Sequence, residues 1–218
     1  GGGRNETPEF VDEIETIVFR PYWNITPRIM RDEIKPGYEQ DSTYLSSRGM
    51  ELVQKGKVIP TTPEHVALIG TEGVRVRQRP GAQNALGKVK FLLPNDYGVY
   101  LHDTPTRATF QRERRAESHG CIRLEDAKAF AEWLLRDQPA WTSERIDSAM
   151  GAEKPTDVKL TTKVPVRLEY ATVVAGEDGS LQRFPDVYGR DRVVDRLLRV
   201  GYPLPSRATP VRVILKPD

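Results

Sequence analysis

The stretch Ser118-His119-Gly120-Cys121-Ile122-Arg123 holds the only cysteine of the 218-residue chain. A second histidine, His102, lies a short loop upstream and immediately follows a strand-like run. Histidine, glycine and arginine beside a thiol are neighbours that lower its pKa and create a nucleophile. Cys121 also immediately precedes a helical pattern. The stretch predicts a cysteine acyl-transfer enzyme, and the alternative is an inert buried cysteine, the usual state of a lone thiol.

Acyl transfer by a cysteine needs a base and donors for the developing oxyanion. We assign the base to His102, because a residue at a strand end can project toward the sulfur. His119, two residues from Cys121, is assigned to loop shaping or substrate contact. Gly120 allows a tight turn. The amides of Gly120 and Cys121, at the entry to the following helix, are the candidate oxyanion donors.

Further side chains are candidates for holding the loop or the substrate. Ser118 is a local hydrogen-bond partner, and Arg123 either holds the loop through carbonyl groups or binds a substrate carboxylate. Tyr97 and Tyr100 lie in or beside the strand pattern, and the pattern leaves open which one faces the site. We select Tyr100, together with Trp23, as substrate contacts; core packing is the alternative for Trp23.

The composition excludes several classes of protein. Lys and Arg number 33 against 31 Asp and Glu, and no long basic block occurs, so no nucleic-acid partner is predicted. The densest basic stretch, residues 112–115, is read as a solvated loop, with a role in binding an acidic substrate left open. A single cysteine excludes an intrachain disulfide and a cysteine-based zinc site, and no metal or cofactor is predicted. No apolar run is long enough to span a membrane.

Short apolar runs separated by Gly and Pro turns predict an α+β, β-rich domain. Strands are expected at residues 14–20, 65–69, 74–77, 87–93, 98–101, 158–160 and 164–174. Helices are expected at residues 125–136, 143–150 and 191–200, a hairpin turn at 176–179, and a last strand or disordered end at 210–215. Residues 1–13 are read as a cloning scar or trimmed linker.

Residues 24–63 differ in character from their surroundings. Thr26-Pro27 predicts a helix start, and Pro36-Gly37 predicts its end. A second short helix is expected over residues 42–48, closed by Gly49. We interpret the segment as an inserted lid, with an ordinary surface excursion as the alternative.

The motifs taken together resemble a known family. His102, an intervening stretch of 15 residues (103–117) and the Ser-His-Gly-Cys-Ile-Arg block are similar to the signature of the L,D-transpeptidase catalytic domain, the YkuD-type family. Similar family elements occur upstream, at 80–81, 84–87, 90–91, 94–95 and 100–105. Residues 21–25 and the tail resemble the large periplasmic YcbB-type branch.

The resemblance implies a fold and an activity. It implies a mixed β-sandwich or barrel-like core in one catalytic domain, residues 14–218, with residues 24–63 capping the substrate. Cys121 would take the diaminopimelate carbonyl of a donor tetrapeptide stem as a thioester, release D-Ala and transfer the acyl group to an acceptor stem. The implied setting is cell-wall synthesis and cell shape, with a periplasmic location, peptidoglycan stem peptides as partners and carbapenems as inhibitors.

The resemblance leaves further activities open. Related reactions are 1–3 cross-linking, attachment of outer-membrane proteins to peptidoglycan, and L,D-carboxypeptidase activity. Outside the family, the motif is also compatible with a cysteine peptidase or amidase of unrelated fold and with a non-catalytic wall-binding domain. The signal peptide and any upstream module are expected to lie outside this chain.

Overall fold

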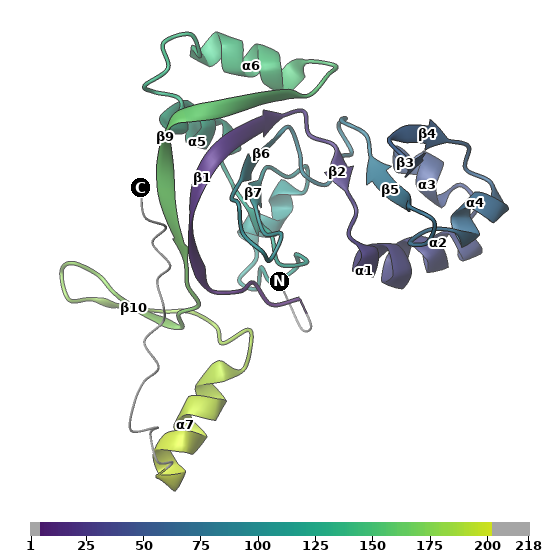
Figure 1. Ribbon diagram of the computed structural model, residues 1–218. Helices are drawn as coiled ribbons and strands as arrows, with labels where there is room; N and C mark the ends of the chain where they lie inside the picture. The colour runs from purple at the N-terminus through teal and green to yellow at the C-terminus, as the bar shows by residue number, and fades with distance from the viewer. Residues whose placement is uncertain (1–4, 202–218) are drawn as a thin grey trace. The chain divides into compact units, whose positions relative to one another are not determined.

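The computed structural model describes residues 5–201 in two compact units, one up to Tyr170 and the other from Ala171 (Figure 1). The expectation of one catalytic domain over residues 14–218 stays a prediction. The first unit is mixed α+β and rich in strands, as predicted. Its sheets are open, and the described residues form no closed barrel.

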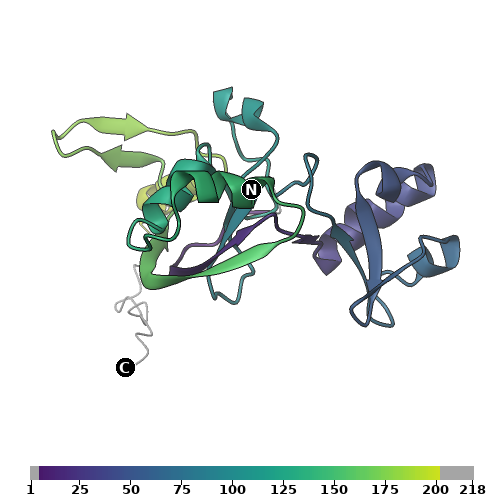
Figure 2. The ribbon, with the colours of Figure 1, turned by 90° about the horizontal axis from the view of Figure 1, so that it is seen from above.

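The base of the first unit is a five-stranded sheet in the order β8-β7-β6-β1-β9. All its neighbouring strands are antiparallel except β7 and β8, which are parallel. Figure 2 shows the long strands β1 and β9 side by side. The bounds are β1 (Phe10–Phe19), β6 (Val89–Leu92), β7 (Leu101–His102), β8 (Ile122–Arg123) and β9 (Thr156–Leu168). The first strand thus begins inside the expected linker, where Phe10 pairs with Leu168.

One face of this sheet forms the main hydrophobic core. Side chains alternate between faces along a strand, so Ile17, Phe19 and Phe91 share a face. They are fully buried in one cluster with residues of α5 (Ala127–Leu134) and α6 (Ser143–Gly151). Burying each such side chain contributes about 1.5–3 kcal/mol. The opposite face is left for the polar residues described below.

Both core-covering helices were predicted, and both have side-chain caps. The Thr142 hydroxyl accepts from Arg145 N at 3.3 Å at the start of α6, and the Asp126 carboxylate accepts from Ala129 N at 2.9 Å at the start of α5. Leu124 and Glu125 lie between the end of β8 and Asp126, the capping residue of α5. The expectation that Cys121 lies at a helix entry is wrong, because the chain first continues into β8 and the capping residue comes five positions later.

Residues 23–78, here called the cap, contain a second core. A four-stranded sheet in the order β2-β5-β3-β4 packs with short helices around buried residues such as Ile34, Leu45 and Leu52. The strands are β2 (Trp23–Asn24), β3 (Met50–Gln54), β4 (Lys57–Ile59) and β5 (Val74–Gln78), and the helices are α1 (Pro27–Ile29), η1 (Met30–Ile34), α2 (Lys35–Gln40), α3 (Tyr44–Ser47) and α4 (Pro63–Ala67). The strand predicted at 74–77 therefore exists, but it pairs with β3 inside the cap.

Two predictions within the cap are wrong. The expected strand at 65–69 is largely the helix α4, because Thr62 accepts from His65 N and Pro63 occupies the first turn. The helix expected to end at Pro36 continues to Gln40. Its η1 segment is a π-turn, with Lys35 N–H bonded to Met30 O, and this wider turn accommodates the proline that an ordinary α-helix would exclude.

The second unit is a hairpin followed by a helix. β10 (Val173–Ala175) pairs with β11 (Leu181–Arg183), and the predicted Gly176–Gly179 turn joins them, with Gly179 at φ +79°. Helix α7 (Arg190–Val200) is also as predicted, but its apolar side chains are exposed. The predicted tail at 210–215 lies outside the described residues. Among residues 5–201, no helix is long and apolar enough to cross a membrane.

Candidate active site

The parallel pairing of β7 and β8 brings the two parts of the sequence motif together. Leu101 is the register partner of Ile122, and His102 is the partner of Arg123. Backbone hydrogen bonds from Ile122 N to Tyr100 O (3.1 Å) and from Leu124 N to His102 O (2.9 Å) fix this register. Leu101 and Ile122 contribute to the helix-covered core. The alternating residues Tyr100, His102, Cys121 and Arg123 therefore share the opposite face.

His102 is held as a neutral imidazole. Its side chain is 5% exposed, and Nδ1 lies 2.5 Å from the backbone carbonyl of Asp103. The Nδ1–H group donates to this oxygen, which leaves Nε2 as the proton acceptor. Burial lowers the pKa of His102 to about 4, and the charge of Arg123 acts in the same direction. The imidazole is thus unprotonated at neutral pH.

Cys121 rests as a thiol. Burial raises the pKa of Cys121 above its ordinary value, while hydrogen bonds from the backbone and side chain of Tyr100 and the charge of Lys90 oppose the shift. The sulfur also donates to Gly98 O at 3.9 Å. No hydrogen bond joins Cys121 to His102 within residues 5–201, although Cys121 directly precedes β8, the neighbour of β7. Catalytic hydrogen bonds are often long in unliganded enzymes and tighten when substrate binds.

Asp103 anchors the loop that connects His102 to Cys121. Its carboxylate is buried. Oδ2 accepts from Lys88 N at 2.9 Å, and Oδ1 accepts from Arg107 at 3.1 Å. Arg107 begins the 3₁₀ turn η2 (Arg107–Gln111). Gly87 lies against this carboxylate at φ +63°, where a Cβ atom would meet Oδ2 at 2.4 Å. These contacts of Asp103 fix the direction in which the loop leaves β7.

The Ser118-His119-Gly120 segment has its own anchors. Gly120 has φ +113°, and its N–H donates to Ser118 Oγ at 3.2 Å. The Thr7 hydroxyl donates to Gly120 O at 2.9 Å, so the N-terminal segment also holds the turn. In this arrangement the Gly120 amide is engaged by Ser118 rather than directed to a free oxyanion site.

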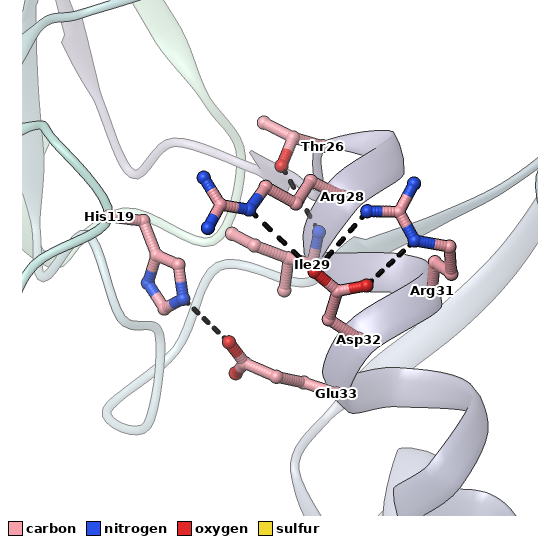
Figure 3. Close-up of polar contacts among 7 residues, drawn as sticks. All are labelled: Thr26, Arg28, Ile29, Arg31, Asp32, Glu33 and His119. Atoms are coloured by element: carbon pink, nitrogen blue, oxygen red, sulfur yellow. Dashed lines mark hydrogen bonds and ion pairs between the residues drawn. The ribbon is translucent and has the colours of Figure 1, made fainter. Parts of the chain in front are cut away.

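The remaining predicted residues are placed differently. His119 Nε2 lies 2.6 Å from Glu33 Oε1 of the cap (Figure 3). Trp23 lies in β2 and packs against the core of the cap, and no described contact brings it to Cys121. Arg123 is within 4.0 Å of Glu117, but its buried Nε has no hydrogen-bond partner in the described structure. An unsatisfied buried donor of this kind is suited to a substrate oxygen.

Sequence reasoning missed three contributors: Asp103, Glu33 and Lys90. The charged residue at 90 inside an alternating strand was a usable signal, since it shares a face with His102 across β6 and β7. No sequence signal indicated Glu33, because its partner His119 is 86 positions away. No group of three or more His, Cys, Asp or Glu side chains is arranged to hold a metal in residues 5–201.

Comparison with known proteins indicates the same kind of enzyme as the geometry of the site. A family model described as the L,D-transpeptidase catalytic domain, YkuD, matches residues 1–166. A protein of Haemophilus influenzae named "Putative L,D-transpeptidase" is 32% identical over 197 residues, which cover 89% of this chain. The chain spans about 40% of the length of that relative. With three quarters of its length matched to the family model, the chain belongs to the YkuD family of L,D-transpeptidase catalytic domains.

Proposed function

We propose that this domain cross-links peptidoglycan stem peptides through a thioester on Cys121, giving a 3–3 bond. One observation carries the proposal: the β7–β8 pairing and the residues just before it bring Tyr100, a neutral His102 and Cys121 to one face, with His102 oriented by Asp103 O. A thiol beside an oriented neutral imidazole is the arrangement that nucleophilic acyl transfer requires. Family membership supports the choice of substrate.

In the first half-reaction, Cys121 gives its proton to His102 Nε2 and its sulfur attacks the diaminopimelate carbonyl of a donor tetrapeptide. The new carbon–sulfur bond replaces the amide bond to D-Ala. The leaving amine takes the proton from His102. The tyrosine hydroxyl beside the sulfur and the Cys121 amide are the nearest candidates to stabilise the oxyanion.

In the second half-reaction, an amine of an acceptor stem attacks the thioester carbonyl. The carbon–nitrogen bond forms, the carbon–sulfur bond breaks and the proton of the amine returns to the sulfur through His102. The unsatisfied Nε of Arg123 is suited to a carboxylate of a stem peptide. The cap, which contacts the catalytic loop through Glu33 and His119, is assigned to hold the stems and to exclude water.

The same residues serve related reactions. Attack by a different acceptor gives 1–3 cross-linking or attachment of an outer-membrane protein, and attack by water gives L,D-carboxypeptidase activity. We propose a periplasmic location and carbapenem acylation of Cys121 on the same grounds. A non-catalytic wall-binding role is the alternative from another class, and it requires an unreactive thiol.

Product analysis tests the proposal. The purified domain is incubated with tetrapeptide muropeptides, and the products are identified by mass spectrometry. The expected products are free D-Ala and a 3–3 linked dimer, both abolished in Cys121→Ala and His102→Ala but retained above a tenth of wild type in His119→Ala. A carbapenem is expected to add its full mass to wild type and none to Cys121→Ala. Dimers from Cys121→Ala, or substrate returned unchanged by the wild type, would overturn the proposal.

A further inference from the structure

Lys90 is the one lysine that the central sheet, within the described residues, places beside the candidate catalytic residues. It lies in β6, directly opposite His102 in the β6–β7 register. Its Nζ lies 5.6 Å from the ring centroid of Tyr100, within the range of a cation–π contact. Tyr100 in turn hydrogen-bonds the sulfur of Cys121. Lysine, tyrosine and cysteine therefore form a connected group on the polar face of the sheet.

The charge of Lys90 is weakly compensated. The side chain is half-buried, and no ion pair or hydrogen bond engages Nζ within residues 5–201. The nearest acidic residue in the sheet register is Asp157 of β9, which pairs with Val18 of β1, the partner of Lys90. At the spacing of β-strands, the backbones of Lys90 and Asp157 are therefore about 10 Å apart. Burial lowers the pKa of Lys90, whereas Asp157 and Cys121 act to raise it. A desolvated ammonium without a partner is costly unless a negative charge appears beside it.

We propose that Lys90 is a positioning residue for acyl transfer: its ammonium stabilises the thiolate of Cys121 and fixes the ring of Tyr100 against the sulfur. The inference rests on the proposed function, since it concerns the nucleophile assigned there. Cys121 is the group beside Lys90 that becomes negative during the reaction, when its proton passes to His102. In a partly buried site this attraction is stronger than in water.

The other charged groups around Lys90 do not replace it. Arg123 is displaced toward the outer edge of the sheet and lies near Glu117, which compensates part of its charge. His102 is neutral in the resting site. Asp157 acts on Lys90 from the far side, and its negative charge disfavours a thiolate rather than stabilising it. Removing the ammonium therefore takes away the positive charge in β6 that favours the thiolate of Cys121.

The test measures the reactivity of Cys121, the only thiol, toward iodoacetamide across pH 6–11. Lys90→Met removes the charge and keeps the length of the side chain. It is expected to slow alkylation about tenfold at neutral pH and to move the midpoint of the profile up by about 1 pH unit. Lys90→Arg is expected to restore at least half of the lost rate. Lys57→Met, at an exposed lysine in β4 of the cap, is the control and is expected to match wild type.

Circular dichroism and thermal melting establish that each variant is folded, and Lys90→Gln replaces Lys90→Met if the latter does not fold. A folded neutral variant whose alkylation profile coincides with wild type would overturn the inference. The readout needs no peptidoglycan, so it separates the two proposals. A shifted profile in a protein that makes no cross-linked product supports Lys90 and removes the proposed function. An unshifted profile in a protein that does make the product removes Lys90 alone.

Discussion

His119 Nε2 and Glu33 Oε1 lie 2.6 Å apart and join the turn before Cys121 to the cap. The His119 ring donates its Nε2–H to the carboxylate, while Glu33 projects from the π-turn η1 (Figure 3). Both side chains are at least 40% exposed, so the pair contributes little to global stability. Its effect is local, because it connects the turn before Cys121 to a segment with a separate hydrophobic core.

Glu33→Ala is expected to loosen the cap without unfolding the protein. The free energy of unfolding should fall by less than about 1 kcal/mol, since the pair is solvent-exposed. Water should reach the thioester more often, so the ratio of hydrolysed tetrapeptide to cross-linked dimer should rise about two- to fivefold. Mass spectrometry of the muropeptide products measures this ratio.

Asp32→Ala is the matched control for Glu33→Ala. Asp32 is the adjacent acidic residue, but its carboxylate pairs with Arg28 at 3.6 Å and Arg31 at 2.7 Å within the cap (Figure 3). Its removal should leave the product ratio at the wild-type value. Equal ratios in both variants would show that the contact with His119 has no effect on water access.

The pH dependence of stability should carry the signature of His102. The folded-state pKa of about 4 lies below the ordinary value of 6.5, so the unfolded chain binds the proton more readily. Stability is therefore fully present above about pH 6.5 and is lost as pH falls toward 4. The loss should reach about 2 kcal/mol at pH 5 and about 3 kcal/mol near pH 4. Urea unfolding at several pH values measures it.

His102→Gln should remove most of this slope, because glutamine does not titrate. His65→Gln is the control: His65 lies in the cap helix α4, where Nδ1 is 2.7 Å from Pro60 O. That variant should keep the wild-type slope. An unchanged slope in His102→Gln would mean that His102 is not buried in its neutral form.

Most helices and turns could be predicted from the sequence, because the residues that specify them lie within the same helix or turn. The Thr142 cap and the stripe of α6 act within one helix, and the Gly176–Gly179 turn acts within one hairpin. The helix end predicted at Pro36 was wrong, because the π-turn before Pro36 accommodates a proline that would usually break the helix. Nothing in the residues around Pro36 indicates that wider turn.

Part of the candidate site could also be predicted from the sequence, because its motif is local. A sequence motif predicted Cys121 and His102 as site residues, and the register of β7 and β8 brings the two to one face. The contacts made by Glu33 and Lys90 depend on elements that meet only after folding. The sheet partner of Lys90 is 12 positions away, and the partner of Glu33, His119, is 86 positions away on an exposed loop. Long-range pairing of this kind is set by tertiary packing rather than local propensity.

Gly87→Ala should damage the site through Asp103. The methyl group would meet Asp103 Oδ2 at 2.4 Å, and alanine at φ +63° is itself strained. Conformational strain of about 1–2 kcal/mol and weakened bonds from Lys88 N and Arg107 should together cost at least about 3 kcal/mol of unfolding free energy. Because the Asp103 carbonyl orients His102, carbapenem acylation of Cys121 should also slow by at least about tenfold.

Gly56→Ala separates backbone strain from the contact with Asp103. Gly56 has φ +79° in the turn between β3 and β4, and a Cβ atom there meets nothing within 4 Å. It should lose only about 1–2 kcal/mol and acylate at the wild-type rate. Urea unfolding and intact-protein mass spectrometry measure both effects. If the two variants lose equal stability and acylate equally fast, then Gly87 serves only its own turn and Asp103 does not hold His102 in place.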